Sequence, residues 1–221
     1  TIFKNIYKLD PGCYSEIYFK KNQLPKINIQ KYWKLENINN RKDNPNHLES
    51  INQLDIKLSN VVKNQIFADV EVGTFLSGGI DSSLITAKAQ EISSKKVKTF
   101  CIGTDDKSHD ESKYASSVAK HLSTDHEELI LNENEIIKDI PSIVSSLNEP
   151  FGDSSFIPTY YVSKLAQKKV KVVLTGDAGD EIFGGYNRYT RLKYVSKLYK
   201  LPKGLKKVMS NSLSNLSEKN I

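Results

Sequence analysis

The chain has 221 residues, of which 38% are hydrophobic, and this is enough apolar material to build a buried core. No apolar run approaches the roughly 20 residues that a membrane-spanning helix needs, and the first residues lack the apolar stretch of a secretion signal. The two cysteines, Cys13 and Cys101, are too few for a disulfide framework. We therefore predict a cytoplasmic location and no membrane partner.

The net charge of +6 is unevenly distributed along the chain. Residues 188–221 carry nine basic residues and one acidic residue, a net charge of +8, whereas residues 1–187 carry 23 basic and 25 acidic residues, a net charge of −2. A basic protein is a candidate for nucleic-acid binding. Because the basic excess is confined to the C-terminal segment, where it is typical of a solvated helix face, we predict no nucleic-acid partner.

The N-terminal residues 1–35 are predicted to be rich in β-structure. Residues 13–19 alternate between apolar and polar types, and residues 27–35 form a second run with strand character. A polar, Asn-rich stretch over residues 36–46 is predicted to be a linker. Apolar residues then recur at helical spacing, which predicts an amphipathic helix over about residues 48–67.

From residue 70 onward, short β-branched runs alternate with helical stretches. The predicted order is a strand at 70–76, a helix from about Asp81, a strand at 97–102, a helix from about Asp110, a strand at 126–131, helical segments at 136–147 and 155–167, and a strand at 170–174. Pro141 and Pro158 interrupt or start those two helical segments. The alternation, with one strand reading Val-Lys-Val-Val-Leu, predicts an α/β fold whose parallel sheet is covered by helices on both faces.

A loop rich in glycine and serine directly follows the strand at 70–76 and precedes a helix. From Phe75 to Ser83 it reads Phe-Leu-Ser-Gly-Gly-Ile-Asp-Ser-Ser, without the Gly-Lys-Ser/Thr ending of a Walker A motif. Adjacent glycines let successive backbone N–H groups converge on an anion, and the N-terminal end of the following helix adds a positive dipole. Asp81 would repel a bound phosphate unless a divalent cation such as Mg²⁺ lay between them. The alternative is an ordinary turn in which Asp81 or a serine caps the helix.

A second cluster follows the strand at 170–174. Asp177, Asp180 and Glu181 lie within five residues, separated by small residues, where parallel sheets bind ligands beyond the carboxyl ends of their strands. One of these carboxylates could share a metal with Asp81, and the alternative is a solvated turn with Asp180 as a helix N-cap. The tripeptide Cys101-Ile102-Gly103 ends another strand and is either an apolar wall for a nucleobase or part of the core.

These motifs together resemble the synthetase domain of glutamine-hydrolysing asparagine synthetases. The segment 77–82 resembles the pyrophosphatase loop of the N-type ATP pyrophosphatases, and the resemblance covers about residues 45–190. It includes Asp110-Glu111 and the segments 119–127, 148–155 and 176–186. Residues 1–33 resemble, more weakly, the last strands of the family's glutaminase domain.

The resemblance implies a fold and a domain order. The fold is the α/β fold of the pyrophosphatase-loop enzymes, with a parallel sheet of the five-stranded type and helices on both faces. The implied order is a remnant of a glutaminase-type domain over 1–35, a linker over 36–46, an ATP-binding synthetase core over 47–190, and the start of a truncated helical region over 191–221.

The resemblance also implies a reaction. ATP and aspartate give a β-aspartyl-adenylate and pyrophosphate, and ammonia then displaces AMP to give asparagine. The implied cofactors are ATP and Mg²⁺. The implied partners are the small molecules ATP, aspartate and ammonia, the glutaminase domain of the same protein, and, as an open alternative, a second copy of the chain in a homodimer. The family's N-terminal nucleophilic cysteine and its C-terminal lysine facing the phosphates have no matched counterpart here, so we expect the chain alone to lack glutaminase activity and leave its synthetase activity open.

Site residues follow from the resemblance position by position. ATP and pyrophosphate are expected to bind Phe75, Leu76, Ser77, Gly78, Gly79, Asp81, Ser82, Ser83, Ile102, Gly103, Thr175 and Gly176. Asp81 and Asp180 are expected to hold Mg²⁺, and Asp177 and Glu181 are the candidate catalytic carboxylates, with Asp177 assisting the addition of ammonia. The edge of the substrate pocket is expected at Glu149, Asp153, Ser154 and Ser155, for which an ordinary capped loop is the alternative.

Two other functions remain open at the level of the sequence. One is a related enzyme, such as a β-lactam-forming synthetase or an amidotransferase of sugar or peptide modification, that acts on another carboxylate. The other is a non-catalytic nucleotide-binding fragment. A panel of carboxylate acceptors scored by pyrophosphate release separates the first from asparagine synthesis, and nucleotide binding without pyrophosphate release would indicate the second.

Overall fold

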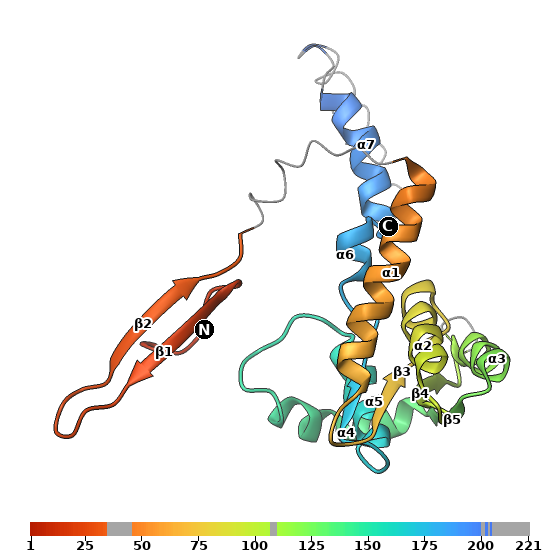
Figure 1. The fold of residues 1–221 in the computed structure, drawn as a ribbon, viewed down its shortest axis with the longest axis horizontal. Coiled ribbons are helices and arrows are strands. Elements are labelled where there is room, and N and C mark those ends of the chain that lie inside the picture. Colours follow the sequence, from red (N-terminus) through yellow and green to blue (C-terminus); the bar gives the residue numbers. More distant parts are fainter. Residues whose placement is uncertain (35–45, 107–109, 200–201, 203, 205–221) are drawn as a thin grey trace.

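The computed structural model describes residues 1–34, 46–106, 110–199, 202 and 204. At the N-terminus, β1 (Cys13–Tyr18) and β2 (Lys26–Lys31) pair as an antiparallel hairpin (Figure 1). Both predicted strands are therefore confirmed, although the second ends at Lys31. The predicted linker lies outside the described residues except for Asn46, whose side chain caps the first helix.

The rest of the described chain is an α/β core. Its elements are α1 (His47–Ile66), β3 (Val72–Phe75), α2 (Ile80–Ile92), β4 (Lys98–Thr104), α3 (Ser112–Leu122), β5 (Asp125–Leu131), α4 (Glu133–Ser145), α5 (Phe156–Ala166), β6 (Val172–Leu174), α6 (Gly179–Phe183) and α7 (Asn187–Tyr199). The strands and helices predicted between residues 48 and 174 are all present, with ends that shift by a few residues, and α6 is an addition. Of the helical region predicted over 191–221, α7 covers the part up to Tyr199, and most of the remainder lies outside the described residues. Pro141 lies inside α4 without ending it. Pro158 lies in the first turn of α5, where its missing N–H has no helical partner to lose.

Strands β3 to β6 form one parallel sheet in the order β5-β4-β3-β6. The predicted α/β class is confirmed, and the described residues supply four strands where the family resemblance suggested five. The chain runs outward from β3 through β4 to β5 and then returns to place β6 on the other side of β3. A parallel sheet has its ligand crevice at such a reversal, outside the carboxyl ends of the strands. The crevice therefore lies where β3 and β6 end.

Helices cover both faces of the sheet, as predicted. On one face Cys101 of β4 packs with Leu76 against Ala119 of α3, and Val72 of β3 packs with Leu174 of β6 against residues of α1 and α2. On the other face Phe100, the neighbour of Cys101 in β4, packs against α5. Neighbouring strand residues thus point to opposite faces, which is the geometry of a sheet buried on both sides.

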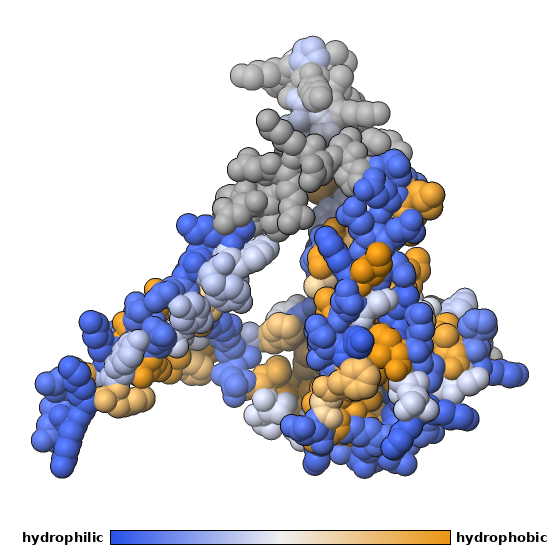
Figure 2. Space-filling view, in the orientation of Figure 1, coloured by the Kyte–Doolittle hydropathy of each residue, from blue (hydrophilic) through white to orange (hydrophobic). Residues whose placement is uncertain are grey.

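Apolar side chains also reach the surface over α1 on the face drawn in Figure 2. Of this helix, Leu48, Ile51 and Ile56 are at least half exposed. In the same view the apolar surface over this helix is interrupted by hydrophilic side chains. Scattered apolar residues are common on protein surfaces. No helix in the described part of the chain is long and apolar enough to cross a membrane.

A buried pair of hydroxyl groups joins β3 to α2, the two elements on either side of the glycine-serine loop. The Oγ1 atoms of Thr74 and Thr86 are 2.9 Å apart, and both residues are fully buried. Thr86→Val is expected to lower the free energy of unfolding by about 1–3 kcal/mol, because it leaves the buried Thr74 hydroxyl without this partner. The double variant Thr74→Val/Thr86→Val should lose less than the single variant. Denaturant unfolding measures both, and a single variant as stable as the wild type would contradict the prediction.

Candidate functional site

The loop between β3 and α2 has a backbone that only glycine fits at one position. Gly78 has a φ of 82°, and a Cβ atom on it would lie 2.5 Å from the Cβ of Tyr114 in α3. The following residue, Gly79, is the N-cap of α2 and provides no side-chain cap. The alternative in which Asp81 or a serine caps the helix is therefore wrong. The first turn of α2 carries no side-chain cap, which is the arrangement that an anion at a helix N-terminus requires.

Serine hydroxyls brace this loop. The Oγ atoms of Ser77 and Ser82 are 3.0 Å apart, and the N–H of Gly79 donates to Oγ of Ser77 at 3.2 Å. The N–H of Ser77 donates to Oγ of Ser82 at 3.2 Å. Two hydroxyl groups and the N–H groups of Ser77 and Gly79 are thus gathered in one short loop. Ser83 lies one residue further into α2, and its buried Oγ has no hydrogen-bond partner among the described residues.

The acidic segment after β6 lies directly against this loop. A Cβ atom on Gly179 would lie 2.4 Å from Oδ2 of Asp81, and one on Gly176 would lie 2.6 Å from the backbone nitrogen of Ser82. Small residues here let the two segments approach each other, as the predicted shared metal requires. The N-cap of α6 is Ala178, in the left-handed conformation at a φ of 68°, so the alternative in which Asp180 caps a helix is wrong.

The two segments enclose a cavity of about 620 Å³, which we call the loop cleft. It is lined by Phe75, Ser77, Gly79, Ile80, Asp81, Ser82, Glu111, Thr175, Gly176, Asp177, Gly179, Asp180, Phe183 and Gly185. Four of these residues are acidic and none is basic, so the potential in the cleft favours a cation. No group of three or more His, Cys, Asp or Glu side chains in the described ranges is arranged to hold a metal ion. A cation here would need further oxygens from a bound ligand, which is how Mg²⁺ binds with phosphates.

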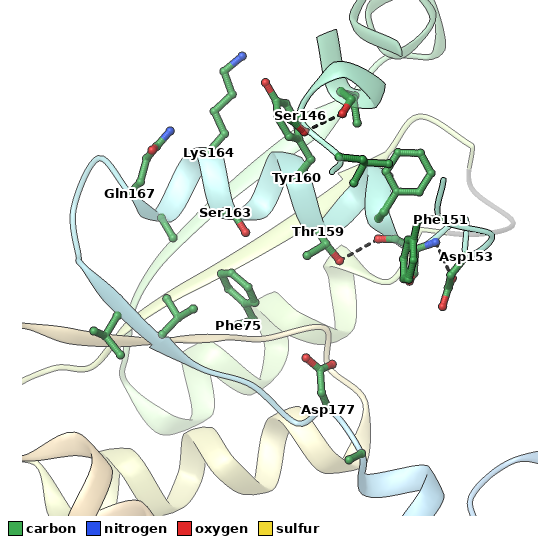
Figure 3. A pocket seen from close by; sticks show the side chains of 18 of the residues that line it. Phe75, Ser146, Phe151, Asp153, Thr159, Tyr160, Ser163, Lys164, Gln167 and Asp177 are labelled. Atoms are coloured by element: carbon green, nitrogen blue, oxygen red, sulfur yellow. Dashed lines mark hydrogen bonds between the residues drawn. The ribbon is translucent and has the colours of Figure 1, made fainter. Parts of the chain in front are cut away.

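A larger cavity of about 1000 Å³, which we call the α5 cavity, lies between α5, the loop that precedes it and the end of the sheet (Figure 3). Phe151, Thr159 and Tyr160 are among the residues that line it. Phe75 and Asp177 line both the α5 cavity and the loop cleft, so the two cavities meet at these residues. The carboxylate of Asp177 accepts a hydrogen bond of 2.9 Å from the hydroxyl of Thr175, which fixes its orientation at this junction.

Of the four residues predicted at the pocket edge, two line the α5 cavity and two do not. Asp153 and Ser155 line the α5 cavity, and Oδ1 of Asp153 accepts a hydrogen bond of 2.9 Å from the N–H of Ser155, which lowers the pKa of Asp153. Glu149 lies outside both cavities and forms an ion pair with Lys8, which lowers the pKa of Glu149. Ser154 lines neither cavity.

Several residues predicted to contact the nucleotide belong to the core. Leu76 is 1% exposed and packs beside Cys101, whose burial raises its pKa to about 12 and keeps the thiol protonated at neutral pH. Ile102 packs in a cluster beneath α4 and α5. Like these two, Gly78, Ser83 and Gly103 line neither the loop cleft nor the α5 cavity. Of the alternatives for Cys101-Ile102-Gly103, the structure supports the core.

Sequence reasoning missed other residues of the site. Glu111 is not among the predicted site residues, yet it lines the loop cleft. Tyr186 lines the α5 cavity and donates a hydrogen bond of 2.6 Å from its hydroxyl to Oε1 of Glu181. This bond lowers the pKa of Glu181 and raises the pKa of Tyr186 to about 12. The position of Glu111 between β4 and α3 is the feature that could have indicated a site residue, because β4 lies beside β3 in the sheet.

The fold and the two cavities define an α/β protein with a glycine- and serine-rich loop and a group of carboxylates at the crevice of its parallel sheet. Residues 53–219 match the family asparagine synthase. The chain belongs to this family.

Curated relatives agree with that assignment. The chain is 37% identical over 213 residues to a putative glutamine-hydrolysing asparagine synthetase of Methanocaldococcus jannaschii, a match that covers 95% of this chain and 40% of that protein. It is 38% identical over 142 residues to asparagine synthetase 1 of Bacillus subtilis, covering 64% of this chain and 22% of that protein. A putative asparagine synthetase of Mycobacterium bovis is 31% identical over 218 residues, 99% of this chain and 33% of that protein. The chain spans less than half the length of these relatives.

Among solved structures, an NH₃-dependent NAD synthetase from Campylobacter jejuni is similar, with a TM-score of 0.44 and 15% identity. That match covers 62% of this chain and 60% of the other.

Proposed function

We propose that residues 47–190 form the ATP-binding synthetase core of an asparagine synthetase-type amide ligase. The observation that carries the proposal is the close packing of Gly179 against the carboxylate of Asp81. This packing joins an anion-binding loop to an acidic segment around one cleft that has carboxylates and no basic side chain. A protein that bound phosphate alone would place basic groups there, whereas a protein that binds a phosphate together with a divalent cation needs acids.

The loop cleft is the proposed site of the ATP phosphates. Ser77 and Ser82 would donate hydroxyl hydrogens to phosphate oxygens, and the loop N–H groups would add to them. Asp81 and Asp180 would hold Mg²⁺, which when bound would neutralise charge on the departing pyrophosphate. Phe75, at the junction of the two cavities, would contact the nucleoside, with Thr175 and Gly176 nearby.

The acceptor is proposed to be the side-chain carboxylate of aspartate, bound in the α5 cavity beside Asp177. A carboxylate oxygen of aspartate bonds to the α-phosphorus of ATP while the bond from that phosphorus to pyrophosphate breaks. The nitrogen of ammonia then attacks the carbonyl carbon and loses a proton, and AMP leaves with the oxygen that bridged it to the acyl group. Asp177, oriented by Thr175, is the proposed acceptor of that proton.

The source of ammonia is proposed to be glutamine, hydrolysed in a glutaminase domain of the same protein. Residues 1–35 would belong to that domain, and Lys8 and Glu149 would link it to the synthetase core. The ATP that the reaction consumes fits a cytoplasmic location.

The test is an isotope experiment on the complete protein that contains this chain. With Mg²⁺, ATP, ammonium and aspartate labelled with ¹⁸O in the side-chain carboxylate, we expect equal amounts of asparagine, AMP and pyrophosphate, with one labelled oxygen in AMP. Formation of ADP and phosphate would contradict the proposal. Pyrophosphate release with another carboxylic acid but not with aspartate would keep the adenylation and change the substrate. Nucleotide binding in calorimetry without pyrophosphate release would indicate a non-catalytic role.

A further inference from the structure

The short helix α6 carries Asp180 and Glu181, two of the acidic residues of the site, but has little packing of its own. It has five residues and none of them is buried. It is flanked by two residues in the left-handed conformation, Ala178 at a φ of 68° and Gly184 at a φ of 71°. A single helical turn has almost no intrinsic stability in water, because the entropy of ordering its residues exceeds the gain from its few hydrogen bonds. Other contacts must therefore hold this segment against the loop cleft.

The segment that follows α6 supplies such a contact. The hydroxyl of Tyr186 donates a hydrogen bond of 2.6 Å to Oε1 of Glu181. A hydrogen bond to an ionised carboxylate is among the stronger ones in proteins. Because Glu181 is in the middle of α6 and Tyr186 lies beyond its end, the bond fixes the turn that separates α6 from α7. That turn is tight, since a Cβ atom on Gly185 would lie within bonding distance of the Asp180 carboxylate.

Residues in the first turn of α7 hold the ring of Tyr186. The guanidinium carbon of Arg188 lies 4.1 Å from the ring centroid of Tyr186, within the range of a cation–π contact. The centroid of the Tyr189 ring lies 5.7 Å from the centroid of the Tyr186 ring and 5.7 Å from the guanidinium carbon of Arg188. The helices α6 and α7 follow β6 in the chain, and in Figure 1 α6 leads directly into α7. The Tyr186 ring is therefore held by α7 while its hydroxyl holds α6.

We propose that Glu181, Tyr186 and Arg188 form a clamp that fixes α6 and thereby positions Asp180 and Asp177 in the loop cleft. In this role Glu181 is a positioning residue, because its carboxylate is engaged by Tyr186 and acts through the placement of α6. The metal-binding part of the inference rests on the proposed function. The existence of the clamp does not, since it concerns contacts within the chain.

The test compares Tyr186→Phe with Tyr189→Phe in the complete protein. The first removes the hydroxyl that bonds Glu181 and keeps the ring. The second removes a hydroxyl from the neighbouring ring, for which the described residues provide no hydrogen-bond partner in the site. The rate of hydrogen exchange at the backbone amides of residues 178–185 measures how firmly α6 is held and needs no ligand. Calorimetry with a non-hydrolysable ATP analogue at varied Mg²⁺ measures the apparent Mg²⁺ affinity, which depends on the position of the carboxylates.

For Tyr186→Phe we expect amide exchange at residues 178–185 to be faster and the apparent Mg²⁺ affinity to fall, each by about 3- to 10-fold, with an unchanged melting temperature. Tyr189→Phe should match the wild type in both. Glu181→Gln keeps an oxygen that accepts from Tyr186, so it should lose less than Glu181→Ala.

Two results would overturn the proposal. Unchanged exchange in Tyr186→Phe would show that no clamp exists. Faster exchange with an unchanged Mg²⁺ affinity would show that the contact does not position the acidic residues. If the wild-type protein binds no nucleotide, the proposed function fails, and the exchange measurement alone still decides whether the clamp is present.

Discussion

Asp81→Asn is expected to weaken Mg²⁺-dependent nucleotide binding strongly while leaving the fold intact. Asp81 lies in the first turn of α2 at the wall of the loop cleft, where its carboxylate approaches α6. Asparagine has nearly the same shape, so packing is kept, but it lacks the charge that balances a cation beside phosphate. Pyrophosphate release should fall by at least about 100-fold, the range found when one group that stabilises developing charge is removed. Calorimetry with ATP, with and without Mg²⁺, measures the binding directly.

The control for this variant is Asp69→Asn. Asp69 is an exposed residue in the bend before β3 and lines neither cavity, so its substitution removes the same charge without touching the cleft. If Asp81 and Asp180 bind one ion, Asp180→Asn should show the same defect, and the double variant should be little worse than either single variant. Binding of Mg²⁺ and nucleotide by Asp81→Asn at wild-type strength would mean that other residues hold the cation.

The sequence was most informative where burial on both faces of a sheet imposes a pattern. The strands β3, β4 and β6 are short runs rich in β-branched residues and bounded by helices, and this pattern follows from the covering of a parallel sheet by helices. The glycines and serines of the loop were equally informative, because a left-handed residue such as Gly78 leaves little choice of side chain. The family resemblance adds the prediction that Asp81 and Asp180 share a metal ion, and the structure places both residues at the loop cleft.

Other features depend on distances that no local pattern records. Phe75 and Leu76 are adjacent apolar residues at the end of β3, and both were predicted to contact the nucleotide. The structure places Leu76 in the core against α3 and Phe75 at the cavities. Glu111 could be recognised as a site residue only once the end of β4 was known to lie beside the end of β3.

The helix α6 was missed for a related reason. Its sequence begins with Gly179 and Asp180, and glycine and aspartate by local preference favour a turn. Contacts with α2 and with Tyr186 outweigh that preference. The first contact comes from a distant part of the chain and the second from the segment that follows the helix. Local propensity is a weak guide wherever tertiary contacts decide the conformation.

Gly179→Ala is expected to impair the site through a single methyl group. At this helical position alanine would be favoured over glycine by up to about 1 kcal/mol on backbone grounds alone. The new Cβ atom would, however, lie 2.4 Å from Oδ2 and 2.5 Å from Cγ of Asp81. The end of the short Asp81 side chain must therefore turn away, whereas the backbone can stay in place. We expect stability to change little. The rate of pyrophosphate release should fall by about 10- to 100-fold, because even a small displacement of a group at the reacting centre lowers the rate by such a factor.

A double-variant cycle separates this mechanism from general damage to α6. In an Asp81→Ala background the carboxylate is gone, so Gly179→Ala should no longer reduce Mg²⁺-dependent binding further, and thermal unfolding should show the gain expected for alanine in a helix. Gly152→Ala is the control for adding a methyl group, since its Cβ atom would meet nothing within 4 Å. Full activity in Gly179→Ala would contradict the placement of Asp81 against α6. An additive loss in the Asp81→Ala background would mean that Gly179 acts through the helix itself. The predicted pattern, a loss that depends on Asp81, would establish that glycine is required at this position to leave room for the carboxylate.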